Sequence, residues 1–132
     1  MTTKKINDKY NESDYSTGAF VEGGIKEQTR QSLTNVKTIL EEVGLNMSNV
    51  VKTTVFMADM GNFAEMNAVY AEFLTEPYPA RSAVAVKTLP KGALVEIEVI
   101  AAIELKLKPL SIRTSGFTDS VIRWMRIYTQ HK

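Results

Sequence analysis

The sequence contains no cysteine and a single histidine, and these two shortages exclude whole classes of chemistry. Without cysteine there is no disulfide and no catalytic thiolate. The histidine, His131, is the penultimate residue of the sequence. A chain terminus is usually too poorly ordered to hold a general base or a metal ligand. We therefore expect no histidine-dependent catalytic triad and no metal site.

Long apolar runs and nucleotide-binding motifs are also missing. No apolar segment approaches the roughly 20 residues of a membrane-spanning helix, and the first sixteen residues lack the apolar centre of a secretory signal. The sequence has no P-loop, no paired-glycine nucleotide fingerprint and no EF-hand loop. A net charge of +1 gives no support for a nucleic-acid partner. These features predict a cytoplasmic protein that uses neither a cofactor nor a membrane.

Three regions differ in composition along the 132 residues, a length typical of one domain. Residues 1–16 are polar and charged without periodicity, which favours an unstructured, variable arm. Residues 17–103 carry regular hydrophobic patterns, and residues 104–132 hold six Lys and Arg against two acids. The sequence therefore predicts an N-terminal arm, a folded domain over 17–103 and a basic C-terminal extension.

Hydrophobic periodicity within 17–103 predicts two helices and three strands. The helices are expected at Ile25–Val43 and from Asn62 to Leu74, and the strands at Asn49–Met57, Ser82–Leu89 and Ala93–Ile103. Pro90-Lys91-Gly92 suits a turn that would join the last two strands into a hairpin. The order helix, strand, helix, strand, strand indicates an α+β fold, a small mixed sheet with two helices on one face.

Apolar side chains fall on both faces of the predicted strands, although two helices can cover only one face. Val84, Val86, Ile97 and Val99 are among the residues that supply them. A small sheet with an apolar second face usually buries it against another copy of the chain. We therefore expect an oligomer.

The extension after residue 103 allows more than one interpretation. Leucines alternate with lysines directly after residue 104, so the last strand can continue to Pro109. Farther on, apolar residues at helical spacing predict a short helix with Thr118 or Asp119 as its N-cap (Val121, Trp124, Met125, Tyr128). A helix docked on the domain, a loosely ordered tail and a basic surface for a membrane or partner all fit this pattern. We expect part of Leu105–Tyr128 to pack on the domain, with Trp124 largely buried.

Three charged residues form a polar cluster, of which Arg81 and Glu96 are the candidate site residues and Glu98 is interpreted as structural. Arg81 stands at the start of the fourth element, and Glu96 and Glu98 share one face of the last strand because they are two residues apart. Arginine can hold a carboxylate through two parallel hydrogen bonds and stays charged at any working pH. The cluster could therefore bind a small anionic substrate. In the alternative interpretation, Arg81 forms a structural salt bridge with Glu96 or Glu98.

Several motifs in 17–103 resemble the RidA/YjgF family of enamine and imine deaminases. They are T-G at 17–18, N-A-V-Y at 67–70, P-A-R-S at 79–82 and E-I-E at 96–98, in matching order. The resemblance implies a chorismate-mutase-like fold and a homotrimer whose sheets face the centre, with active sites between subunits. It also implies an activity, the hydrolysis of 2-iminobutanoate and 2-iminopropanoate to 2-oxo acids and ammonia.

The resemblance assigns roles to three residues and requires no metal or cofactor. Arg81 would grip the substrate carboxylate, Glu96 would position the attacking water or a proton, and Asn67 would line the pocket. Ala83 stands where many relatives have cysteine or threonine. The family pattern also begins with two strands that have no counterpart before Thr17. A second interpretation therefore stays open: a catalytically impaired scaffold that binds small carboxylates or other proteins.

Overall fold

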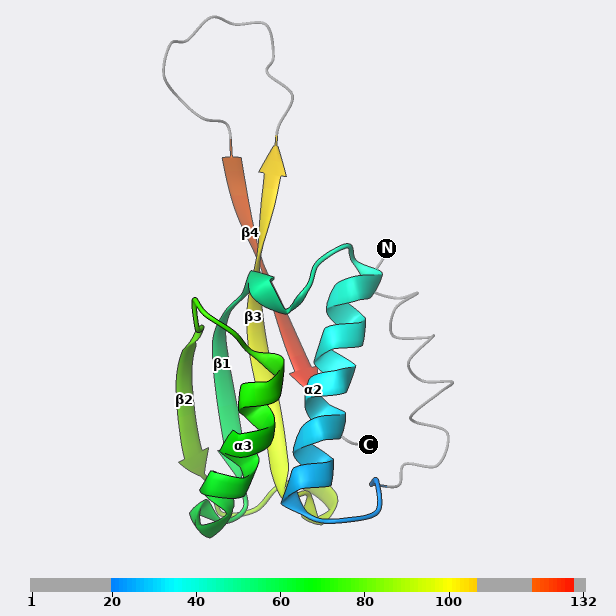
Figure 1. The fold of residues 1–132 in the computed structure, drawn as a ribbon, viewed down its shortest axis with the longest axis vertical. Helices are drawn as coiled ribbons and strands as arrows, with labels where there is room; N and C mark the ends of the chain where they lie inside the picture. The colour runs from blue at the N-terminus through cyan, green and yellow to red at the C-terminus, as the bar shows by residue number, and fades with distance from the viewer. Residues whose placement is uncertain (1–19, 107–119, 130–132) are drawn as a thin grey trace, which may run out of the picture.

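The computed structural model describes residues 20–106 and 120–129, shown in Figure 1. The helices are α2 (Ile25–Glu42) and α3 (Phe63–Phe73), and the strands are β1 (Val50–Met57), β2 (Ala80–Ala85), β3 (Val95–Lys106) and β4 (Ser120–Thr129). The strands form one mixed sheet in the order β2-β1-β3-β4. Both helices lie against the same face of this sheet (Figure 1). The expected α+β fold, a small mixed sheet with two helices on one face, is confirmed.

The expected hairpin between β2 and β3 is wrong, because β1 lies between these strands. β1 pairs in parallel with β2 and antiparallel with β3. The turn at Pro90–Gly92 does form, but it carries the chain across the end of β1 instead of back along β2. Each edge of a buried strand presents N–H and C=O groups that need partners. β1 obtains these partners from β2 on one edge and from β3 on the other.

The core lies between the helices and the sheet face that they cover. From α2 it receives Leu33, Val36 and Leu40, all fully buried, and from β3 it receives Ile97 and Val99, also fully buried. These helix positions recur at three- and four-residue spacing, which places them on one stripe. Alternate residues of β3 do the same on the sheet. The helix ends where the sequence indicates, because Gly44 has a φ of +78°, a conformation that favours glycine.

The C-terminal extension contributes a strand, so the predicted helix after Asp119 is wrong. β4 pairs antiparallel with β3, from Ile97 opposite Thr129 to Lys106 opposite Ser120. Its sequence, SVIRWMRIYT, is rich in β-branched and aromatic residues, which favour strands. The edge of β3 also offers backbone partners that no helix could use. Packing of the extension on the domain is confirmed by this ladder, whereas the side chain of Trp124 lies outside what the structure describes.

The β3–β4 pair is longer than the rest of the sheet. β1 pairs with β3 only as far as Ala101, and beyond it the two strands continue together as a ribbon (Figure 1). The boundary expected at residue 103 therefore falls inside β3. The expected N-terminal arm, residues 1–16, lies outside the described residues. Within the described ranges, no helix is long and apolar enough to cross a membrane.

Removal of β4 is expected to destabilise the domain. A chain ending at Lys106 would leave one edge of β3 without the backbone partners that β4 supplies. We expect the free energy of unfolding in urea to fall by several kcal/mol. A matched chain ending at Thr129 keeps every pair of the ladder and should unfold like the full-length protein. Equal urea midpoints for the two truncated chains would contradict a stabilising role for β4.

Candidate functional site

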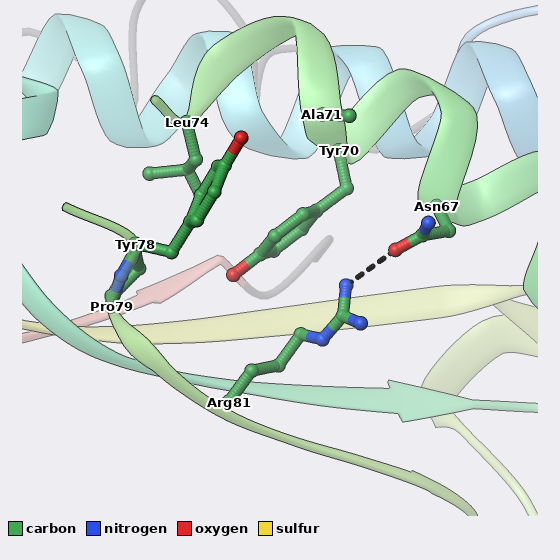
Figure 2. A pocket seen from close by; sticks show the side chains of 7 residues that line it. All are labelled: Asn67, Tyr70, Ala71, Leu74, Tyr78, Pro79 and Arg81. Carbon is green, nitrogen blue, oxygen red and sulfur yellow. Dashed lines mark hydrogen bonds between the residues drawn. The ribbon is translucent and has the colours of Figure 1, made fainter. Parts of the chain in front are cut away.

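The strand register fixes the side of the sheet on which Arg81 lies. Arg81 on β2 is the partner of Thr53 on β1, and Thr53 is the partner of Val99 on β3. Partners in register point to the same face of a sheet. Thr53 and Val99 are 1% and 0% exposed, beneath the helices. Arg81 therefore reaches from the edge strand β2 toward α3, as Figure 2 shows.

Three residues of α3 hold the guanidinium of Arg81. Its Nη1 donates a hydrogen bond to Asn67 Oδ1 at 2.6 Å. Its central carbon lies 4.7 Å from the ring centroid of Tyr70 and 5.4 Å from that of Phe63. Both distances are within the range of cation–π attraction. The side chain of Arg81 is thus anchored at its head, although the residue itself is exposed.

Tyr70 is in turn fixed from below by the sheet. Its hydroxyl oxygen lies 2.7 Å from Thr53 Oγ1, within hydrogen-bond distance. Burial raises the pKa of the Tyr70 hydroxyl, while the hydrogen bond with Thr53 and the charge of Arg81 act in the opposite direction. The phenol is therefore neutral at neutral pH and presents an intact ring face to the guanidinium.

An open pocket of about 470 Å³ lies beside this cluster, between α3 and the start of β2. Arg81 supplies a charged group and Asn67 an amide. The other lining residues are Tyr70, Ala71, Leu74, Tyr78 and Pro79, and the two tyrosines also carry hydroxyls (Figure 2). Asn67 binds Nη1 of Arg81. Among residues 20–106 and 120–129, no hydrogen bond from Nε or Nη2 of Arg81 is found, so within these ranges both donors are available to a ligand. The pocket suits a small carboxylate with an apolar chain.

The two glutamates lie on the far face of the sheet, the face that does not carry α2 and α3. Glu96 is the partner of Phe56, and Glu98 is the partner of Thr54. Glu96 is three positions and Glu98 one position before the helix-facing Val99, so both point to the other face. The interpretation of Arg81 as the salt-bridge partner of either glutamate within one chain is therefore wrong. The role assigned to Glu96 stays a prediction.

The sequence pattern placed Arg81 and Asn67 in one site, and the structure brings their side chains together. It did not identify Phe63, Tyr70 or Thr53 as part of that site. The available signal was the spacing: Phe63, Asn67 and Tyr70 are four and three residues apart, so they share one helix face. Within 20–106 and 120–129, no group of three His, Cys, Asp or Glu residues could hold a metal ion.

Another arginine of the same surface serves a different purpose. Arg30 on α2 makes a forked pair with Glu72 on α3, through Nη1 to Oε2 and through Nη2 to Oε1 at 3.1 Å. The hydrogen bond raises the pKa of Arg30 and lowers that of Glu72. Both side chains are about half exposed, and such surface pairs add little stability. Arg30 is paired with Glu72 and does not line the pocket of Arg81. Its substitution is therefore a matched control for substitutions of Arg81.

Known proteins match this chain over most of the domain. Residues 11–103 match the family described as endoribonuclease L-PSP. The RutC family protein PH0854 of Pyrococcus horikoshii is 54% identical over 88 residues, which are 67% of this chain and 70% of that protein. The 2-iminobutanoate/2-iminopropanoate deaminase of Salmonella typhimurium is 50% identical over 91 residues, again 67% and 70% of the two chains.

Solved structures agree with these sequence matches. The crystal structure of E. coli TdcF with bound serine superposes with a TM-score of 0.58 at 43% identity. The superposition covers 61% of this chain and 66% of that one. The described fold is therefore shared with that structure over most of the domain.

The hydrogen bond between Thr53 and Tyr70 predicts coupled effects on stability. Thr53→Val and Tyr70→Phe should each lower the free energy of unfolding by about 1–3 kcal/mol, because each leaves a buried hydroxyl without its partner. The double variant should be less destabilised than the sum, since it removes both groups together. Urea unfolding of all four proteins measures this coupling.

Thr54→Val is the matched control, because Thr54 is the next residue of β1 and lies on the far face. Its effect should be small and should add to that of Tyr70→Phe. Additive losses for Thr53→Val with Tyr70→Phe would contradict the hydrogen bond.

Proposed function

Because the chain belongs to the endoribonuclease L-PSP family, which includes the RidA/YjgF imine deaminases, we propose that it hydrolyses reactive 2-imino acids. The substrates would be 2-iminobutanoate and 2-iminopropanoate with their enamine tautomers, and the products would be 2-oxo acids and ammonia. The observation that carries this proposal is the guanidinium of Arg81, anchored in a pocket whose other walls combine apolar side chains with two tyrosines. Such a pocket fits a short carboxylic acid.

Substrate binding is assigned to Arg81 and Asn67. The fork of Arg81 would take the substrate carboxylate through two parallel hydrogen bonds. Asn67 would hold the third side of the guanidinium and so keep the fork turned toward the pocket. A relative supports a ligand of this size and charge, since TdcF of E. coli was crystallised with serine, a small amino acid with a carboxylate.

The reaction itself needs only water and proton transfer. A protonated imine is already electrophilic at its carbon. Water adds there, a C–O bond forms, the C–N bond breaks, and the nitrogen leaves as ammonia after it has gained a proton. A carboxylate within hydrogen-bond reach can orient the water and transfer the proton. We assign this role to Glu96. Arg81 would hold the carboxylate of the same substrate during the reaction.

These assignments place the site between two copies of the chain. Arg81 points toward α3, whereas Glu96 lies on the far face, with β1 between their strands. A single chain therefore does not offer both groups to one small molecule. The far face also carries Val84, which is 46% exposed, and the half-buried Phe56. Burial of this face in a homotrimer would bring Glu96 of one copy near Arg81 of the next.

The alternative is a scaffold that binds small carboxylates or other proteins without turnover. The same separation of Arg81 from Glu96 favours it, because a chain that does not assemble would keep the binding group and lack the proposed base. Ala83 also provides no thiol or hydroxyl beside Arg81. The most useful experiment measures ammonia released from freshly generated 2-aminoacrylate with and without the protein. Binding of 2-oxobutanoate without any acceleration would favour the scaffold.

Arg81→Ala should abolish turnover and leave the fold intact. Hydrogen bonds to charged groups contribute about 1.5–3 kcal/mol each, so loss of two should lower kcat/KM by about 100-fold or more. Arg81→Lys should also be poor, because an ammonium cannot reproduce the planar fork. Arg30→Ala is the control and should keep wild-type activity, since Arg30 lies outside the pocket. Full activity of Arg81→Ala would contradict the proposed role.

Mixed assemblies test whether Arg81 and Glu96 come from different copies. Arg81→Ala and Glu96→Gln proteins should each be inactive alone. If they are unfolded together at equal amounts and refolded, random trimers with sites shared between copies should recover about one quarter of wild-type activity. Sites contained within one chain would recover none. Sedimentation at micromolar concentration should show the trimer, and a monomer would contradict the shared site.

A further inference from the structure

Arg81 lies in a closed set of contacts that includes Thr53, a buried residue of β1, the strand next to the edge strand β2. Thr53 is the register partner of Arg81, so both belong to one row across the sheet. The Thr53 hydroxyl binds the Tyr70 hydroxyl, and the Tyr70 ring lies against the guanidinium. Thr53 of the sheet and Tyr70 of α3 together therefore support the guanidinium of Arg81.

The arginine needs such support because of its position. It lies on the edge strand β2, is exposed, and has a long side chain with many rotamers. A ligand that had to order this side chain would bind more weakly, because ordering it costs conformational entropy. Contacts that order the guanidinium beforehand remove this cost from binding.

Tyr70 is the contact best suited to fix the plane of the guanidinium. Its ring centroid is nearer to the guanidinium carbon than that of Phe63, 4.7 Å against 5.4 Å. Tyr70 is also only 7% exposed, and its far end is bound to Thr53, whose β-branched side chain is stiff. The ring is therefore held both along its buried body and at its hydroxyl. Asn67 completes the arrangement by accepting a hydrogen bond from Nη1.

We propose that Tyr70, held by Thr53, is a positioning residue that fixes the plane of the Arg81 guanidinium for recognition of the substrate carboxylate. This inference rests on the proposed function, because it gives Arg81 the same ligand. Tyr70 itself touches no reacting atom in this account. Its loss should weaken substrate binding and leave the chemical step unchanged.

Two substitutions at position 70 separate the ring from the hydroxyl. Tyr70→Leu removes the ring, so about a tenfold rise in KM is expected from the lost cation–π contact, while kcat stays within about twofold. Tyr70→Phe keeps the ring and loses its anchor, so the rise in KM should be smaller. Phe73→Leu is the matched control. Phe73 lies on the same helix and packs on the same core, but it does not line the pocket of Arg81.

A second readout does not depend on turnover. The ¹H–¹⁵N signal of the Arg81 Nε–H group should be shifted by the ring current of Tyr70 in the wild-type protein. The shift should disappear in Tyr70→Leu and persist in Tyr70→Phe and Phe73→Leu. Titration with 2-oxobutanoate, a stable 2-oxo acid, should move this signal and give a dissociation constant that rises in Tyr70→Leu as KM does.

The outcomes distinguish this inference from the proposed function. If the wild-type protein binds 2-oxobutanoate but does not accelerate imine hydrolysis, the proposed function fails and the dissociation constants still decide the role of Tyr70. If Tyr70→Leu leaves the Arg81 signal, KM and the dissociation constant unchanged, the positioning role is overturned and the proposed function stands. A general loss of kcat shared by Tyr70→Leu and Phe73→Leu would also overturn it, because that result indicates a structural role. If the wild-type protein neither binds 2-oxobutanoate nor releases ammonia from 2-aminoacrylate, both proposals are overturned.

Discussion

The structure depends on β1 having a partner on each of its edges. Because β2 pairs on one side and β3 on the other, the arginine and the glutamate of the candidate site are separated by a strand. The same register brings Thr53 into one row with Arg81. The position of β1 therefore brings Thr53 beside Arg81 and keeps the glutamate of β3 away from Arg81 within one chain. A hairpin of β2 with β3 would have produced neither arrangement.

The candidate site is an anchored cation at the edge of an apolar pocket. A free arginine on an edge strand would be a flexible surface charge, of little use for orienting a small acid. Here α3 supplies an amide acceptor and two aromatic rings, and the sheet holds one of those rings through a hydroxyl. The contacts are individually modest. Together they present one planar fork in a defined direction, which recognition of a carboxylate requires.

The sequence predicted the fold class, the two helices and the central strand, because these depend on local periodicity. It predicted Arg81 and Asn67 through motif resemblance, and the structure places them in contact. It did not predict that β1 separates β2 from β3, since a short turn after β2 is equally compatible with a hairpin. It also assigned helical spacing to β4. Apolar residues at 121, 124, 125 and 128 fit a helix, but an unpaired strand edge nearby favours a ladder, and that edge is a tertiary feature.

A crystal structure of the wild-type protein with 2-oxobutanoate tests the central claim most directly. The account predicts the ligand in the pocket between α3 and β2, with both carboxylate oxygens within hydrogen-bond distance of the Arg81 fork. Tyr70 should still lie against the guanidinium, and Glu96 of a neighbouring copy should approach the 2-oxo group. A ligand bound elsewhere, or an Arg81 that turns away from Tyr70 to meet it, would contradict the account.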